Sequence, residues 1–202
     1  MSDKFANIVS WVFQPLVVPF YGLVALWFAP FFYDYAPQTK LSLLALLAFA
    51  LVLIPLLCYL LMRKIDFIKT PQADNRLERT GIYAITVFCY LVAGFILMYT
   101  HVGHVYTFVV FVMAACLMVL SVINFFWKIS AHAMGMGAML SAMLMLMWYN
   151  QTDRPFIYIV WILLTGLVCA ARLQVRAHTP AQLVAGFSVG FVPLFTLLLL
   201  MN

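Results

Sequence analysis

Charged side chains are scarce in this sequence. Asp, Glu, Lys and Arg make up 8% of its 202 residues, whereas 67% are hydrophobic and the mean hydropathy is +1.08. Soluble domains carry about 25% charged residues, and a chain of this size cannot hide so much apolar surface in a core. These values exclude a soluble globular protein and a disordered chain, and they indicate that lipid surrounds most of the protein.

Cysteine is also sparse, and its positions have no disulfide or zinc spacing. Every cysteine lies within an apolar run, as expected of small buried hydrophobic residues, so a secreted disulfide scaffold is excluded. The 11 Lys and Arg exceed the six Asp and Glu, but they are scattered between apolar runs, which argues against a nucleic-acid partner. The cysteines are Cys58, Cys89, Cys116 and Cys169.

Long apolar runs fill the chain instead. A helix that spans a bilayer needs about 20 mostly apolar residues, and lipid satisfies no backbone groups, so such segments should be helical. The sequence predicts an all-α fold, a polytopic transmembrane helix bundle with about six to seven spans in a single integral membrane domain over residues 1–202. Candidate spans cover residues 8–32, 41–62, 81–100, 107–126, 133–149, 156–171 and 181–201.

Proline and glycine predict two local features. Pro15, Pro19 and Pro30 interrupt the first run, and we expect them to break it into an interfacial piece and a span. Gly186 and Gly190 form a Gly-x-x-x-Gly pair in the last run, which is typical of closely packed membrane helices.

Two histidines lie where polar junctions enter apolar runs, His132 and His178, and Lys and Arg accompany them. Ionisable residues at membrane depth are functional candidates. Arginine matches phosphate oxygens, and histidine can attack phosphorus or protonate a leaving oxygen. The set therefore predicts a phosphate site. The alternative is that these residues mark helix ends at the membrane interface.

The spacing of these residues resembles a known family. Lys69 and Arg76 are separated by six residues, Ser130 precedes His132 by two, and Arg172-x5-His178-x3-Gln182 follows. This order is similar to the Lys-x6-Arg-Pro, Pro-Ser-Gly-His and Ser-Arg-x5-His-x3-Asp motifs of the type 2 phosphatidic acid phosphatase superfamily of integral membrane lipid phosphatases. The resemblance covers residues of about 69–190, the expected phosphatase-like core, and looks like a divergent bacterial branch.

The resemblance implies a role for each matching residue. His178 would be the nucleophile that forms a phospho-histidine, and His132 the general acid for the leaving group. The phosphoryl oxygens would be held by Lys69, Arg76, Ser130 and Arg172. The family's mechanism uses no metal and no cofactor, so we expect neither here.

Several positions depart from the family pattern. Leu77 and Ile129 replace prolines, Ala131 replaces glycine, and Ala171 replaces serine. The most consequential change is Gln182, because the family uses Asp there to orient the nucleophilic histidine and to stabilise its charged form. An amide can still accept a hydrogen bond but brings no charge. Thr179-Pro180-Ala181-Gln182 also has the pattern of a helix start with a capping box, and both interpretations remain open.

The sequence thus favours a membrane lipid phosphatase acting on a lipid phosphate or isoprenyl diphosphate, with membrane lipids as its surroundings. One alternative is a degenerate member that binds or transports a phospholipid, and another is an unrelated transporter or structural membrane protein. All six acidic residues lie in loops or termini, which argues against proton coupling. The expected location is a bacterial inner membrane. The charge distribution favours a cytoplasmic site, whereas bacterial relatives usually face the periplasm. The sequence gives no indication of the oligomeric state.

Overall fold

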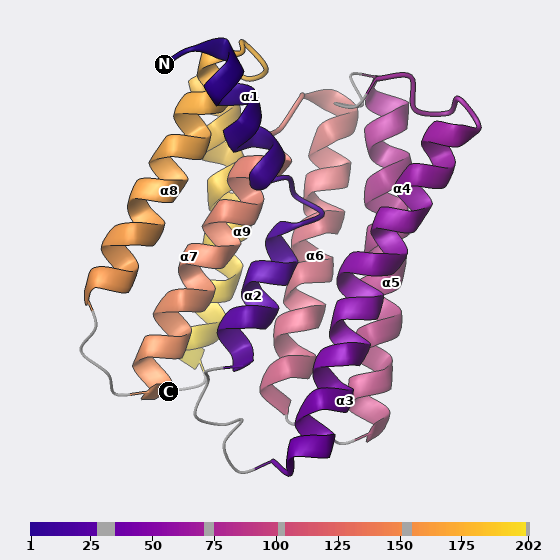
Figure 1. Ribbon diagram of the computed structural model, residues 1–202, viewed down its shortest axis with the longest axis vertical. Coiled ribbons are helices and arrows are strands. Elements are labelled where there is room, and N and C mark those ends of the chain that lie inside the picture. The colour runs from indigo at the N-terminus through magenta and orange to yellow at the C-terminus, as the bar shows by residue number, and fades with distance from the viewer. Residues whose placement is uncertain (28–34, 71–74, 101–103, 151–154, 201–202) are drawn as a thin grey trace. The chain divides into compact units, whose positions relative to one another are not determined.

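The computed structural model describes residues 1–27, 35–70, 75–100, 104–150 and 155–200, and the regular secondary structure in these ranges is helical (Figure 1). Within these described ranges, six helical segments are long and apolar enough to cross a membrane. The predicted all-α membrane bundle is therefore confirmed. The fifth and sixth predicted spans extend into their polar flanks, as α7 (Ala131–Asn150) and α8 (Pro155–Gln174).

The chain divides into two compact units. We call them the terminal unit, Met1–Leu41 with Ile129–Asn202, and the middle unit, Ser42–Lys128. The single domain expected from the sequence stays a prediction beside this division. The terminal unit holds α1 (Asp3–Val12), α2 (Val18–Trp27), α7 (Ala131–Asn150), α8 (Pro155–Gln174) and α9 (Pro180–Leu200). The middle unit holds most of α3 (Pro37–Ala48), the π-helical turn Phe49–Leu53, α4 (Ile54–Lys64), α5 (Arg76–Thr100) and α6 (His104–Phe126).

The first apolar run is broken, as its prolines predict. α1 ends at Val12 and α2 begins at Val18, with Pro15 in the connection between them. Proline has no backbone N–H and cannot continue a helix ladder, but it fits the first turn, where Pro19 lies in α2. Pro30 lies outside the described residues.

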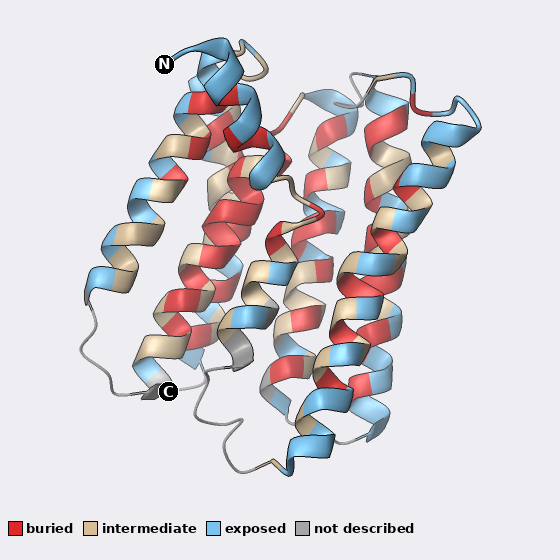
Figure 2. Ribbon diagram, in the orientation of Figure 1, coloured by how far each residue is buried: buried red, intermediate tan, exposed pale blue. Residues whose placement is uncertain are grey.

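Helix α7 forms the centre of the terminal unit, where it packs against α2, α8 and α9. Most of its side chains are buried (Figure 2). A Cβ on Gly190 would overlap the carbonyl oxygen of Met134, and one on Gly186 would overlap that of Ser130. The glycine pair of the last run therefore makes the predicted close helix contact, backbone against backbone.

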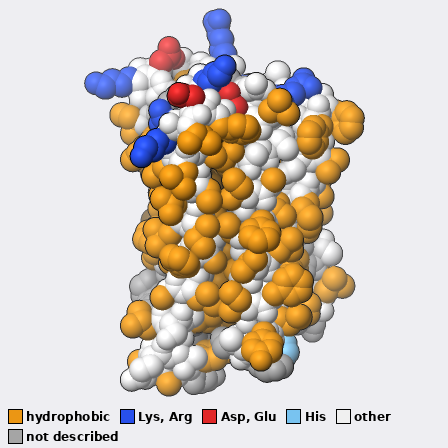
Figure 3. All heavy atoms as spheres, turned by 90° about the vertical axis from the view of Figure 1, so that its right-hand side faces the viewer, with side chains coloured by type: hydrophobic (Ala, Val, Ile, Leu, Met, Phe, Trp, Pro, Cys, Tyr) orange, Lys and Arg blue, Asp and Glu red, His pale blue; other side chains and the backbone are white. Residues whose placement is uncertain are grey.

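The middle unit is held by α5, which packs against α4 and α6. Along its flank, hydrophobic side chains cover the helices and charged side chains gather at one end (Figure 3). This distribution suits helices that cross a bilayer and end in water.

Candidate active site

The polar residues of the terminal unit meet at the N-terminal end of α9. His178 precedes this helix, and its Nδ1 lies 3.2 Å from Oε1 of Gln182. The backbone N–H of Thr179 donates to the same oxygen at 3.0 Å, and the Gln182 N–H donates to Oγ1 of Thr179 at 3.4 Å. The capping box is confirmed, and Gln182 contacts the histidine at the same time.

This arrangement determines the tautomer of His178. A backbone N–H can only donate, so the Gln182 atom that accepts from Thr179 must be the amide oxygen. That oxygen can only accept, so Nδ1 of His178 must carry the proton that lies between them. In the neutral ring, Nε2 then holds a lone pair, which is the form that a nucleophile requires.

Ser130 brings the start of α7 to the same place. Its side chain is fully buried, and its Oγ accepts from the Ala133 N–H at 3.3 Å, which makes it the N-cap of α7. Its own backbone N–H donates to the Gln182 carbonyl at 3.4 Å. The close approach of Gly186 to the Ser130 carbonyl fixes this contact, so the second and third motifs are joined through backbone atoms.

Arg172 reaches the site from the last turn of α8 and is 8% exposed. The helix ends two residues later, at Gln174, where the Ala177 N–H donates to the Arg172 carbonyl and the Arg176 N–H donates to that of Leu173. Arg176 has a positive φ of 52°. These are the features of a Schellman motif, which normally places glycine at the left-handed position. This turn lies between Arg172 and His178, which are six residues apart.

His132 is the second residue of α7 and is partly buried. Arg172 and His178 both lie near enough to interact electrostatically with its imidazole ring. Its Nε2 lies 3.1 Å from the backbone carbonyl of Ser10, in α1. A carbonyl only accepts, so Nε2 carries a proton and the neutral ring has its lone pair on Nδ1. The two histidines therefore hold opposite tautomers.

A comparison with protein families identifies the same part of the chain. The model of the PAP2 superfamily matches residues 124–202. This confirms the predicted resemblance, and the PAP2 region, as we call these residues, contains both histidines, Ser130, Arg172 and Gln182. No curated protein and no solved structure matches the chain.

Two predicted phosphate ligands precede the PAP2 region and belong to the middle unit. Lys69 lies after the end of α4, and Arg76 is the first residue of α5. The Arg76 guanidinium donates to the Phe125 carbonyl at the end of α6 at 3.0 Å. The phosphate-binding role of both residues stays a prediction.

The sequence reasoning missed Asn124, which organises the polar end of the middle unit together with Arg79. Arg79 is buried and donates to Oδ1 of Asn124 at 3.0 Å. The Asn124 amide donates in turn to Oγ1 of Thr80 and to the Arg76 carbonyl. The signal was present in the sequence, because Asn124 is a polar residue inside an apolar run.

Among the parts of the chain that the structure describes, no three His, Cys, Asp or Glu side chains lie together as a metal site would require. The expectation of a metal-free, cofactor-free reaction stays a prediction.

Proposed function

We propose that the protein is a membrane lipid phosphatase, which hydrolyses a lipid phosphate or isoprenyl diphosphate through a phospho-histidine intermediate. The observation that carries the proposal is the hydrogen bond between His178 Nδ1 and Gln182 Oε1 within the PAP2 region. It leaves the lone pair of the neutral His178 ring on Nε2, and the buried Arg172 precedes His178 by six residues.

In the first step, the Nε2 lone pair of His178 attacks phosphorus and the bond from phosphorus to the leaving oxygen breaks. His132 gives its proton to that oxygen. Arg172 stabilises the charge on the equatorial oxygens, and the N-terminus of α7 at Ser130 adds a favourable dipole. The ring of His178 becomes cationic, with phosphorus on Nε2 and a proton on Nδ1.

In the second step, His132 takes a proton from water, whose oxygen attacks the phosphoryl group. The bond from phosphorus to Nε2 breaks, and the pair of electrons returns to His178. Gln182 accepts from Nδ1–H throughout, but it brings no negative charge to offset the cationic ring. The chain should therefore turn over more slowly than a relative with Asp at this position.

Lys69 and Arg76 are proposed as further phosphate ligands on the strength of motif spacing alone. The same resemblance supports a bacterial origin and an inner membrane. The substrates that the proposal implies are lipid phosphates with different headgroups, including phosphatidic acid, phosphatidylglycerophosphate and isoprenyl diphosphates.

The test is phosphate release by the purified full chain in detergent, over this panel of lipids. Wild-type protein should release phosphate and form an acid-labile, alkali-stable phosphoprotein, and His178→Ala should abolish both. His104→Ala, which removes an exposed histidine at the start of α6, is the matched control and should leave release unchanged. Equal release by His178→Ala and wild type would refute the nucleophile.

A second candidate is a member that binds or moves a phospholipid without hydrolysis, which the uncharged Gln182 favours. Tight binding of a lipid phosphate to the wild type, with no release of phosphate, would support it. Appearance of activity in Gln182→Asp would then identify the missing charge as the cause.

A further inference from the structure

Helix α1 lies outside the PAP2 region, yet it contacts the predicted general acid. Ser10 lies near its C-terminal end, and the Ser10 carbonyl accepts from Nε2 of His132. The two residues are 122 positions apart in the sequence. We propose that α1 is a positioning helix for His132, which holds Nε2–H on the Ser10 carbonyl so that the proton for the leaving group is delivered from Nδ1. This inference rests on the proposed function.

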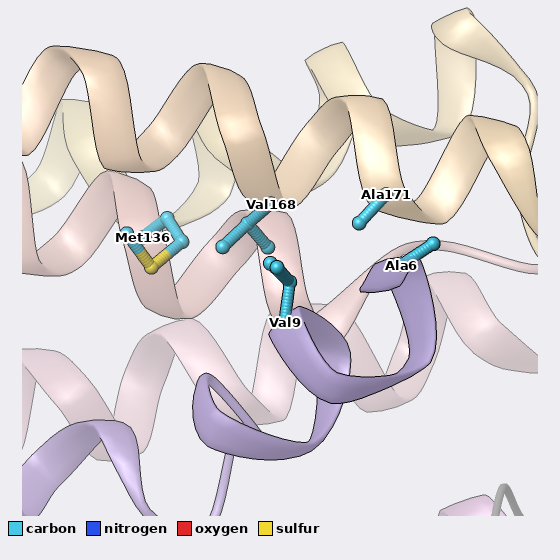
Figure 4. Close-up of a cluster of buried hydrophobic side chains, with 5 residues drawn as sticks. All are labelled: Ala6, Val9, Met136, Val168 and Ala171. Carbon is cyan, nitrogen blue, oxygen red and sulfur yellow. The ribbon is translucent and has the colours of Figure 1, made fainter. Parts of the chain in front are cut away.

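The docking of α1 on the terminal unit is specific. Ala6 and Val9 are buried against Val168 and Ala171 of α8 and Met136 of α7 (Figure 4). Ala6 is fully buried, so this side of α1 has no room for a larger side chain.

Polar contacts fix both ends of the helix. At one end, Nε2 of Gln174, the last residue of α8, donates to Oδ1 of Asp3 at 2.9 Å. At the other end, the Tyr21 hydroxyl donates to the Val12 carbonyl at 2.8 Å. A helix held at both ends places the Ser10 carbonyl in one position.

The opposite face of α1 suits the membrane surface. Phe5, Ile8 and Trp11 are exposed, Trp11 by 77%. An amphipathic helix with large apolar residues on its outer face lies in the interface between lipid and water. Ser10 lies on the inner face, and its Oγ is buried with no hydrogen-bond partner.

The consequence is chemical. A nitrogen whose proton lies on a backbone carbonyl cannot also direct that proton at a leaving oxygen. In the cationic ring, Nδ1–H is then the free donor. After transfer, the neutral ring keeps Nε2–H on Ser10 and presents the Nδ1 lone pair to the attacking water. The same carbonyl therefore serves both steps without moving.

The test compares two variants of the full chain that introduce the same side chain. Ala6→Gln places a large polar group at the buried contact and should displace α1. Lys4→Gln, at an exposed position of the same helix, is the matched control. General acids contribute about 10²- to 10⁴-fold, and mainly when the leaving group is poor. Ala6→Gln should therefore lower turnover of an alkyl lipid phosphate at least about 10-fold more than turnover of an aryl phosphate such as p-nitrophenyl phosphate.

Nitrogen-15 NMR of the imidazoles reads the contact without turnover. Wild type should show His132 in the Nε2–H form and His178 in the Nδ1–H form, with each signal assigned by its alanine variant. In Ala6→Gln, His132 should lose its single tautomer while His178 keeps its own. Lys4→Gln should match wild type in both assays.

The outcomes separate the two proposals. An unchanged His132 tautomer in Ala6→Gln, an equal loss for alkyl and aryl substrates, or a rise in turnover on displacing α1 would overturn the positioning role, even if the protein is a phosphatase. Opposite tautomers that depend on Ala6, in a protein that hydrolyses no lipid phosphate, would refute the proposed function and keep the contact. If Ala6→Gln does not fold, Ala6→Val provides the smaller displacement, with the same expected direction.

Discussion

Two helix pairs, one in each unit, are held together in different ways. In the terminal unit, α7 and α9 approach backbone to backbone, because Gly186 and Gly190 have no side chain to separate them from α7. In the middle unit, α5 and α6 are joined by side chains. Arg79 and Asn124 form hydrogen bonds at one end, and the Phe95 and Phe111 rings pack edge to face farther along.

The difference concerns how much each pair can adjust. Side chains can change rotamer, so the α5–α6 contact can absorb a small change. A backbone contact cannot, and the α7–α9 contact also carries the hydrogen bond from Ser130 to Gln182. The candidate site residues Ser130 and Gln182 therefore lie on the pair with the least freedom, as a preorganised site would require.

The largest effect is expected from Gly190→Ala. The new Cβ would overlap the Met134 carbonyl and lie 2.9 Å from the Ala138 nitrogen, and backbone atoms cannot give way. Stability should fall by about 3 kcal/mol, the upper end of the usual cost of overpacking, measured as thermal unfolding in detergent. Gly166→Ala in α8 is the control, because its Cβ would meet nothing within 4 Å. A Gly190→Ala protein as stable as Gly166→Ala would contradict the backbone contact.

Changes at Gln182 should affect turnover more than stability. Gln182→Leu removes the acceptor for His178, and loss of tautomer control costs up to about 10⁴-fold in the serine-protease triad. We expect a loss of about 10²- to 10⁴-fold in kcat here. Gln182→Glu keeps the reach and the capping box and adds the charge, so turnover should rise.

Thr179→Ala is the matched control for that comparison. It removes the hydroxyl that caps α9 but keeps the backbone N–H that orients Gln182. Stability should fall by about 1 kcal/mol, while most of the turnover remains. Equal losses of turnover in Thr179→Ala and Gln182→Leu would mean that the cap alone matters.

Much of this comparison could be predicted from the sequence. Apolar runs determined the helices, Pro15 predicted the break between α1 and α2, and the glycine pair predicted the α7–α9 contact. Both hydrogen bonds of the Gln182 amide oxygen follow from spacing, because Gln182 is four residues after His178 and three after Thr179, and residues so spaced are neighbours at a helix start. These features are local or periodic, and such features leave a pattern in the chain.

Other parts left no pattern. The contact of His132 with Ser10 uses a backbone carbonyl, which every residue has, so no residue type indicates it. The turn at Arg176 has a left-handed conformation that glycine normally adopts, and arginine gives no hint of it. Spacing from Lys69 selects Arg76 over Arg79 as the candidate phosphate ligand, but it gives no sign that Arg79 is buried and bonded to Asn124.

A pair of substitutions separates those two arginines. Arg79→Met should lower stability by about 1–3 kcal/mol, because Asn124 Oδ1 loses a buried donor. Arg76→Met should lower it by less than about 1 kcal/mol, because its hydrogen bond to Phe125 is exposed. If Arg76 binds phosphate as predicted, its variant should instead raise KM or lower kcat. The measurements are thermal unfolding and steady-state kinetics at a temperature where both variants are folded.

The smallest effects are expected where the two units resemble each other. Two residues after the end of α4 and of α8, a charged residue has a positive φ: Asp66 at 58° and Arg176 at 52°. In both, the following N–H donates back to a carbonyl in the last turn, Phe67 to Met62 and Ala177 to Arg172.

Left-handed backbone costs a non-glycine residue about 1 kcal/mol or more, while glycine raises the entropy of the unfolded chain. Asp66→Gly and Arg176→Gly should therefore raise stability slightly, by less than about 1 kcal/mol. Arg176→Val should lower stability, because a β-branched side chain fits this conformation poorly. Thermal unfolding of the three variants checks this, and a marked loss in Arg176→Gly would mean that the arginine side chain, and not the turn, holds the segment between Arg172 and His178.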